Sequence, residues 1–362
     1  MKIMMAITGM QSGGAERVMA TLCNELSKRH EVCLLIMKTA QSDYSISDRV
    51  EVVAGSIENQ NLLKCVQFTK REITRRNPDV ILSFMTKTNI ILLLAAMQTG
   101  MSRRVVLAER ANPYNAKSIF RIMRRFLYPH AGGAVFQTVQ AQKYYDGIIK
   151  SDSIVLKNPL NPDFDDEAYE GIRRKAIVTM GRLSVEKNQK LLVEAFSKIA
   201  LKYTEYIVEI YGDGPLKEEL QRQIDSSGLN KRVLLMGRKD RVRDYVKDAS
   251  IFVLPSNSEG MPNALLEAMA LGIPSIATDC PIGGSAFIIR DHENGLLLPM
   301  NDADALAQAL AELIQNRVLA EKLGRNGRKV TEDFAAEKVS AEWEAYLKEV
   351  ANRGERWRYK ES

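Results

Sequence analysis

Short apolar segments rich in β-branched residues alternate with helical segments through the second half of this chain. Strands that alternate with helices at this spacing predict βαβ units, and continuous apolar runs predict a parallel sheet buried on both faces. The predicted strands are AIVTMG (176–181), YIVEIYG (206–212), VLLMG (233–237), SIFVLP (250–255) and PSIAT (274–278).

The first half repeats this pattern less regularly. A length of 362 residues is enough for two cores. The segment VLKNPLNPDFDDEAYEG, with its prolines and acidic cluster, is typical of a linker. We therefore predict an α/β protein with two Rossmann-like doubly wound domains, over residues 1–160 and 161–340. Residues 341–362 are predicted to form a helix and a basic tail, and a return of this helix to the first domain stays open. The predicted strands of the first half are KIMMAIT, EVCLLIM, VEVVA, DVILSFM, RVVLAE and GAVFQT.

The charge distribution indicates which partners to expect, and the isolated cysteines indicate the cellular compartment. Residues 1–150 contain 21 Lys and Arg against 11 Asp and Glu, while the remainder has 30 against 34, so the halves are expected to meet different partners. Four isolated cysteines suggest reduced thiols in the cytosol. The apolar start is too short for a signal peptide, and NIILLLAAM is too short to span a bilayer. Nucleic-acid binding by the basic half lacks an aromatic stacking motif.

Charged and glycine residues follow the predicted strands of the second half. Because ligands of doubly wound sheets bind at the carboxyl ends of the strands, these residues are candidates for binding. Arg182 and Lys187 follow the first strand, and Gly237 and Arg238 follow the third. The two cations suit a diphosphate.

Two glutamates are predicted to lie at the same edge of the sheet, where its strands end. Glu259 lies in the loop after the strand at 250–255, and Glu267 lies on the helix that follows. Asn263 and Glu267 are one helical turn apart on one face, and their side chains lean toward the helix N-terminus. Carboxylates bind vicinal hydroxyls of a ribose or hexose. Together with the cations, they indicate a nucleotide-sugar.

The segments GRLSVEKN and SNSEGMPNALLEAMALGIP together resemble the retaining glycosyltransferases of the GT-B fold, whose mark is E-x7-E. The segment ITGMQSGGAERV resembles the N-terminal glycine loop of the same family, so the resemblance runs from Gly13 to Gly295. It implies two domains that face a cleft. It also implies donor roles: Arg182 and Lys187 for the diphosphate, Glu259 for the sugar, Glu267 for the ribose with Asn263 nearby, Gly237 and Arg238 for the base, and Gly13 and Gly14 for the donor phosphates.

The family generally works without a metal, because fixed cations take its place, so no metal and no cofactor are expected. Two D-x-D triplets, at 163–165 and 302–304, match the metal motif of other glycosyltransferases. We interpret the first as part of the linker and the second as a helix start, where aspartate caps.

The acceptor side departs from the family. Many relatives carry a histidine after the strand that here reads VVLAERANP, where this chain has Glu109 and Arg110. The next segment, NAKSIFRIMRRFLYPHAGG, is either an ordinary basic helix or a helix at the cytoplasmic membrane surface that receives an anionic lipid-borne acceptor. It resembles the basic helix of a bacterial enzyme that adds N-acetylgalactosamine to an undecaprenyl-diphosphate-linked glycan. The predicted acceptor contacts are Glu109, Arg110, Lys117, Arg121, Arg124 and Arg125.

The sequence thus predicts a retaining, metal-independent glycosyltransferase, peripheral on the inner face of the cytoplasmic membrane. It is expected to transfer a hexose or N-acetylhexosamine, with N-acetylgalactosamine as the first candidate, from a UDP-sugar to a lipid-linked oligosaccharide in surface-glycan assembly. A sugar-nucleotide epimerase of the same fold and a catalytically silent subunit that binds a partner glycosyltransferase are the alternatives.

Overall fold

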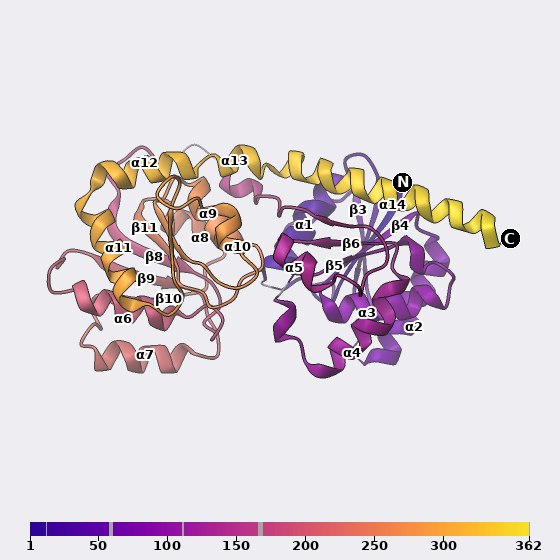
Figure 1. Ribbon diagram of the computed structural model, residues 1–362, viewed down its shortest axis with the longest axis horizontal. Coiled ribbons are helices and arrows are strands. Elements are labelled where there is room, and N and C mark those ends of the chain that lie inside the picture. Colours follow the sequence, from indigo (N-terminus) through magenta and orange to yellow (C-terminus); the bar gives the residue numbers. More distant parts are fainter. Residues whose placement is uncertain (12, 58–60, 111, 166–168, 362) are drawn as a thin grey trace. The chain divides into compact units, whose positions relative to one another are not determined.

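The computed structural model describes residues 1–11, 13–57, 61–110, 112–165 and 169–361, with side chains as far as Gly354. The chain forms two compact units (Figure 1). Unit 1 comprises Met1–Asn161 and Ala336–Ser362, and unit 2 comprises Pro162–Ala335. The sequence placed these boundaries after residues 160 and 340.

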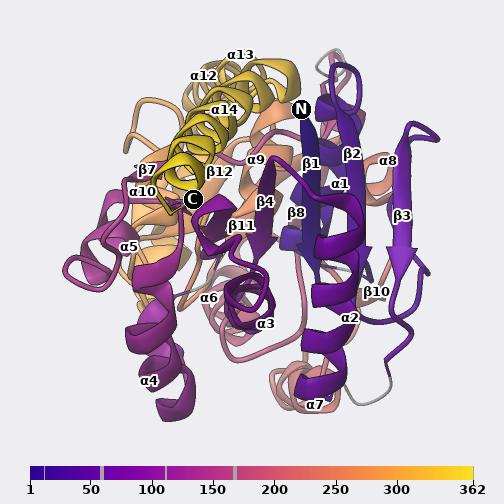
Figure 2. The same ribbon diagram turned by 90° about the vertical axis from the view of Figure 1, so that its right-hand side faces the viewer.

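Unit 1 is built on a seven-stranded parallel sheet in the order β3-β2-β1-β4-β5-β6-β7 (Figure 2). The strand order reverses between β1 and β4, which makes the carboxyl edge beside these strands the expected place for a ligand. The strands are β1 (Lys2–Ile7), β2 (Glu31–Ile36), β3 (Val50–Ala54), β4 (Val80–Phe84), β5 (Val105–Ala108), β6 (Gly133–Phe136) and β7 (Ser153–Val155).

Helices cover this sheet because its central strands are apolar on both faces. All five residues of β4 and all four of β5 are buried. The helices are α1 (Gly14–Leu26), α2 (Leu62–Arg76), α3 (Thr86–Met97), α4 (Ser118–Leu127), α5 (Val139–Tyr144) and the terminal α14 (Ala336–Glu361), with short 3-10 turns η2 (Ser102–Arg104), η3 (Pro113–Asn115) and η4 (Tyr128–His130).

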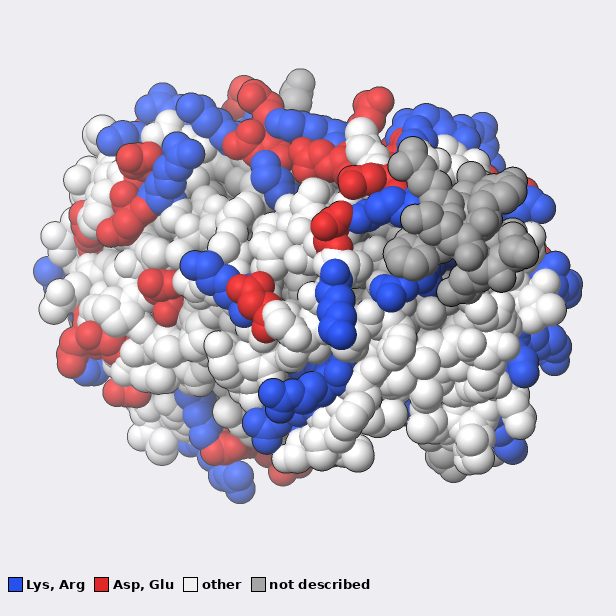
Figure 3. Space-filling model, turned by 45° about the vertical axis from the view of Figure 1, so that its right-hand side comes forward, with Lys and Arg blue, Asp and Glu red and all other residues white. Residues whose placement is uncertain are grey.

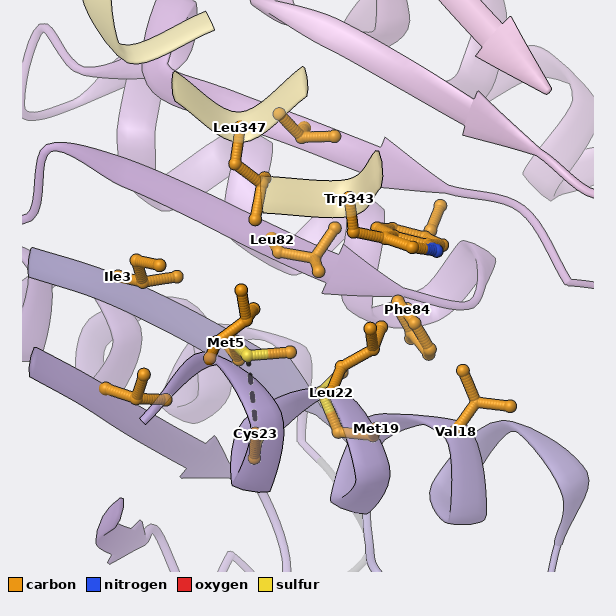
Figure 4. Close-up of a cluster of buried hydrophobic side chains, with 14 of the residues drawn as sticks. Ile3, Met5, Val18, Met19, Leu22, Cys23, Leu82, Phe84, Trp343 and Leu347 are labelled. Carbon is orange, nitrogen blue, oxygen red and sulfur yellow. Dashed lines mark hydrogen bonds between the residues drawn. The ribbon is translucent and has the colours of Figure 1, made fainter. Parts of the chain in front are cut away.

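The terminal helix α14 completes the core of unit 1. Trp343 is fully buried among side chains of β1, β4 and α1, and its ring centroid lies 5.8 Å from that of Phe84 (Figure 4). Its indole Nε1 donates to the carbonyl of Lys157 at 3.0 Å. One turn on, Tyr346 Oη accepts from the amide of Ala134 at 3.0 Å and donates to the carbonyl of Asp152 at 2.7 Å. The last helix is therefore part of the first unit.

Unit 2 has a six-stranded parallel sheet in the order β10-β9-β8-β11-β12-β13, which reverses between β8 and β11. Its strands are β8 (Arg174–Met180), β9 (Ile207–Tyr211), β10 (Val233–Gly237), β11 (Ala249–Leu254), β12 (Ser275–Thr278) and β13 (Leu296–Leu298). Its helices are α6 (Gln189–Ile199), α7 (Lys217–Ser226), α8 (Val242–Val246), α9 (Asn263–Ala270), α10 (Gly284–Ile288), α11 (Ala303–Gln315), α12 (Arg317–Gly327) and α13 (Val330–Asp333), after a 3-10 turn η5 (Pro162–Phe164).

The surface carries both signs of charge, and Figure 3 shows acidic side chains among the basic ones on the face in view. All four cysteines are free and buried. Among the described residues, no helix has the length and apolar character that crossing a membrane requires.

Candidate active site

The loops after β8 and β11 border the point where the strand order of unit 2 reverses. The first loop carries Arg182 and Lys187, and the second carries Glu259. Hydrogen bonds of Asn257 join the loops: the Asn257 amide donates to the carbonyl of Glu186 at 2.7 Å, Asn257 Nδ2 donates to that of Val185 at 3.2 Å, and Asn188 Nδ2 donates to Asn257 Oδ1 at 3.1 Å. The predicted functional groups are thus held together before any ligand arrives.

Lys187 and Glu259 form an ion pair. Lys187 Nζ lies 2.6 Å from Glu259 Oε1, and Ser256 Oγ donates to the same oxygen at 2.6 Å. The Glu259 side chain is 8% exposed and that of Lys187 26%. No described residue donates to Oε2, which leaves this oxygen to accept a hydrogen bond from a ligand.

Ser256 is fully buried beside Glu259 and was not predicted from the sequence. Its carbonyl accepts from Thr278 Oγ1 at 2.5 Å, so β12 holds the serine that orients the glutamate. A serine in a loop has no pattern of its own, and its link to Glu259 three positions later becomes visible only when the loop is folded.

Arg182 is exposed at the same edge. Its carbonyl accepts from Gln189 Nε2 at 3.0 Å, which fixes the backbone. Its guanidinium makes no hydrogen bond or ion pair with a residue that the structure describes. The pKa of the Glu186 carboxyl is lowered, first by a hydrogen bond from the Ser184 hydroxyl and in smaller part by the charge of Arg182. A free guanidinium beside a loop of this kind is able to bind an anion.

Helix α9 begins behind this loop. The side chain of its N-cap residue, Pro262, makes no capping hydrogen bond, and the amides of the first turn carry the positive end of the helix dipole. Asn263 opens the helix, and Glu267 lies one turn on, 3% exposed. Both residues are engaged in an interaction within the protein.

Glycines let the backbone of this edge pack closely. A Cβ on Gly284, the first residue of α10, would lie 1.5 Å from the carbonyl oxygen of Gly260, so the start of α10 packs closely against the Glu259 loop. A Cβ on Gly212 would lie 1.9 Å from the carbonyl oxygen of Gly181. Gly237 has a φ of +67°, and apart from its chain neighbours no described residue has a heavy atom within 4 Å of the place that its Cβ would take. Arg238 beside it is engaged in an interaction.

At the carboxyl edge of unit 1, Gly13 is the N-cap of α1 and Gly14 its first residue. The Gly13 amide donates to Tyr44 Oη at 3.0 Å, and Tyr44 Oη donates to the Gly13 carbonyl at 2.9 Å. The glutamate in the first turn, Glu16, folds back over Gly13: a Cβ there would lie 2.1 Å from Glu16 Oε2. The prediction for the glycine loop included Gly13 and Gly14 but not this carboxylate.

Two predicted acceptor contacts prove to be a buried pair. Glu109 and Arg124 are each 3% exposed, and Arg124 Nη2 lies 3.0 Å from Glu109 Oε2. Thr86, Asn89 and the hydroxyl of Tyr128 also donate to this carboxylate. The prediction of Glu109 and Arg124 as acceptor contacts is therefore corrected: the buried carboxylate needs a cation, and Arg124 supplies it while it anchors α4.

The remaining cations of the segment lie on the surface. Lys117, Arg121 and Arg125 are exposed, at the start of α4 and along it. Between them Ile119 is 57% exposed, Ile122 54% and Phe126 72%. Figure 2 shows α4 at the margin of unit 1. A helix with bare apolar and basic side chains has the composition of an interfacial helix.

A family model described as "Glycosyl transferases group 1" matches residues 165–330, most of unit 2. A relative from Campylobacter jejuni is 28% identical over 97% of this chain and 99% of its own length. Its name is GalNAc-alpha-(1->4)-GalNAc-alpha-(1->3)-diNAcBac-PP-undecaprenol alpha-1,4-N-acetyl-D-galactosaminyltransferase. A second relative from the same organism is 27% identical over 96% of this chain and 99% of its own length. It is named N-acetylgalactosamine-N,N'-diacetylbacillosaminyl-diphospho-undecaprenol 4-alpha-N-acetylgalactosaminyltransferase.

Solved structures of the same fold cover nearly the whole chain. Sucrose-phosphate synthase from Thermosynechococcus elongatus has a TM-score of 0.83 at 18% identity, over 96% of this chain and 98% of its own. Anabaena Alr3699/HepE in complex with UDP and glucose has a TM-score of 0.79 at 16% identity, over 96% and 100%. The chain is a glycosyltransferase of the GT-B fold.

The fold class and the enzyme class predicted from the sequence are thereby confirmed. The roles of single residues in this glycosyltransferase stay predictions, and so does the cleft between the domains. No group of three or more histidine, cysteine, aspartate or glutamate side chains suited to a metal ion is found in the described parts of the chain.

Proposed function

We propose that this glycosyltransferase moves an N-acetylhexosamine or hexose, with N-acetylgalactosamine as the first candidate, from a UDP-sugar to a polyprenyl-diphosphate-linked oligosaccharide. It would act in surface-glycan assembly on the inner face of the cytoplasmic membrane and retain the anomeric configuration. The observation that carries the proposal is the likeness over nearly the whole chain to two transferases named for undecaprenol-linked glycans. The exposed cations of α4 support an anionic acceptor.

The donor chemistry follows from the edge of unit 2. Departure of UDP builds negative charge on the β-phosphate, and Arg182 and Lys187 would stabilise that charge more in the transition state than in the ground state. Glu259 Oε2 would accept from a sugar hydroxyl, and Glu267 would bind the ribose with Asn263 beside it. Gly237 and Arg238 would lie near the base. We propose that no metal is needed, because the two side-chain cations supply positive charge where the diphosphate leaves.

The test is UDP release. The enzyme is incubated with UDP-N-acetylgalactosamine, with and without an undecaprenyl-diphosphate glycan that ends in N-acetylgalactosamine, and the lipid product is weighed by mass spectrometry. We expect UDP release that depends on the acceptor and a product heavier by the transferred sugar. Conversion of the donor to another nucleotide-sugar without UDP release would indicate the epimerase. No turnover of UDP-, GDP-, ADP- or dTDP-sugars would indicate the silent subunit.

The exposed face of α4 gives a second prediction. Arg121→Ala combined with Arg125→Ala should raise the KM for the lipid-linked acceptor about 30-fold, at about 1 kcal/mol for each basic residue near an anionic surface. Arg124 is left in place because it is buried against Glu109. The KM for the donor should stay unchanged.

The matched control removes two exposed cations from α2, by Lys64→Ala with Lys70→Ala. This pair should leave both KM values as they are. If the two double variants have the same acceptor KM, α4 does not bind the acceptor.

A further inference from the structure

Five polar side chains follow strands of unit 1 at the carboxyl edge of its sheet. Glu16 follows β1, Lys38 follows β2 and Arg110 follows β5, while Gln137 and Asn158 follow β6 and β7. The donor chemistry proposed for unit 2 uses none of them. They lie where a doubly wound sheet binds ligands.

Arg110 is a fixed cation with unmade hydrogen bonds. Its Nη2 donates to Asn158 Oδ1 at 2.5 Å, and Gln137 Nε2 donates to the same oxygen at 2.9 Å. Its guanidinium carbon lies 4.5 Å from the centre of the Phe84 ring. Nε and Nη1 are buried and have no partner among the described residues. Leaving such donors without a partner is costly, so they are available to a ligand or a water molecule.

Glu16 is an anion close enough for its charge to interact with Arg110. Burial lowers the pKa of Arg110 to about 9, and the nearby Glu16 opposes that shift. Burial likewise raises the pKa of Glu16, while Arg110 and Lys38 act to lower it. Within the described chain, Glu16 and Arg110 share no hydrogen bond or ion pair. The cation therefore favours the ionised carboxylate without using up its oxygens.

The position of Glu16 decides what kind of group fits at Gly13. Its carboxylate lies against the Gly13 backbone, where an incoming phosphate would meet like charge. A neutral hydroxyl would instead donate to the carboxylate. While Glu16 keeps this place, the glycine loop suits a sugar hydroxyl better than the donor phosphate predicted for Gly13 and Gly14.

We propose that Glu16 binds the terminal sugar of the acceptor by accepting a hydrogen bond from one of its hydroxyls, and that Arg110 is the positioning residue that keeps Glu16 ionised. This inference rests on the proposed function. A simpler role for Glu16 is to cap the first turn of α1, where acidic residues favour the helix dipole. That role would affect stability alone.

Glu16→Gln tests the assignment, with Glu25→Gln as its control. Glu25 lies at the other end of α1, where it pairs with Lys28 at 2.7 Å. Glu16→Gln should lower kcat/KM for the undecaprenyl-diphosphate acceptor about 10- to 100-fold, the value of one hydrogen bond to a charged group. UDP affinity, measured by calorimetry, should not change. The control should leave both values as in the wild type.

The pH dependence of acceptor kcat/KM distinguishes a binding role of Glu16 from a capping role. Acceptor kcat/KM should be full above the raised pKa of Glu16 and fall as the pH drops through it, because the neutral acid accepts a hydrogen bond much more weakly than the carboxylate does. Arg110→Gln should move this fall to higher pH, since the pKa of Glu16 then rises further, and Arg110→Lys should restore it. Glu16→Gln should abolish it.

Three outcomes would overturn the inference. Equal acceptor kcat/KM for Glu16→Gln and Glu25→Gln, with transfer by the wild type intact, would leave Glu16 a capping residue only. Tighter UDP binding by Glu16→Gln would mean that Glu16 excludes the donor phosphate instead of binding the acceptor. A wild type that releases no UDP with acceptor would end the proposed function, and this inference with it.

Discussion

Lys187→Met should lower kcat about 100- to 1,000-fold, the usual cost of removing one group that stabilises charge in a transition state. Lys187 is ion-paired to Glu259 and lies at the edge where the diphosphate is proposed to leave. Methionine keeps the length of the side chain and removes the charge. The measurement is steady-state UDP release with saturating donor and acceptor, together with the melting temperature, because Glu259 loses its partner.

Lys198→Met is the control for this variant. Lys198 lies on the helix that follows the Lys187 loop, and its side chain pairs with Asp304 at the surface. Its kcat should match that of the wild type. A Lys187→Met enzyme with the same kcat as Lys198→Met would show that the charge of Lys187 takes no part in transfer.

Trp343→Ala should destabilise unit 1 by about 3–5 kcal/mol, the usual cost of truncating a buried tryptophan. The side chain packs against Phe84 in the core of unit 1, and its hydrogen bond to Lys157 would be lost as well. Urea unfolding followed by circular dichroism measures the change. The folded variant should still bind UDP, because Trp343 belongs to unit 1 and the proposed donor residues to unit 2.

Glu349→Ala serves as the comparison on the same helix. Its side chain is 61% exposed, and its contact with Arg353 is 3.9 Å long, so the change should stay within about 0.5 kcal/mol. Equal stability of the two variants would mean that α14 does not contribute to the core of unit 1.

The sequence patterns located the long strands of both sheets, because buried parallel strands are continuous apolar runs. Strands β7 and β13 were missed, since each has three residues and too few positions for a pattern. Arg182, Lys187 and Glu259 could be placed at one edge of unit 2 from sequence, because every parallel strand ends at the same edge.

In the basic segment of α4, residue spacing alone could not predict which arginine is buried. Arg124 and Arg125 are neighbours and point about 100° apart on a helix, so one of them turns inward when the other faces solvent. The sequence could not say that Arg124 is the inner one, because the reason is the buried carboxylate of Glu109. Glu16 was missed for a related reason: an acidic residue in a first turn has the pattern of a cap.

The central claim is that the diphosphate of a UDP-sugar binds at the edge of unit 2 between the β8 loop and the start of α9. The most direct measurement is a crystal structure of the protein with UDP. The account predicts the β-phosphate within hydrogen-bonding distance of Arg182 and Lys187, and the ribose at Glu267. A UDP molecule bound elsewhere, with these three side chains free of it, would contradict the account.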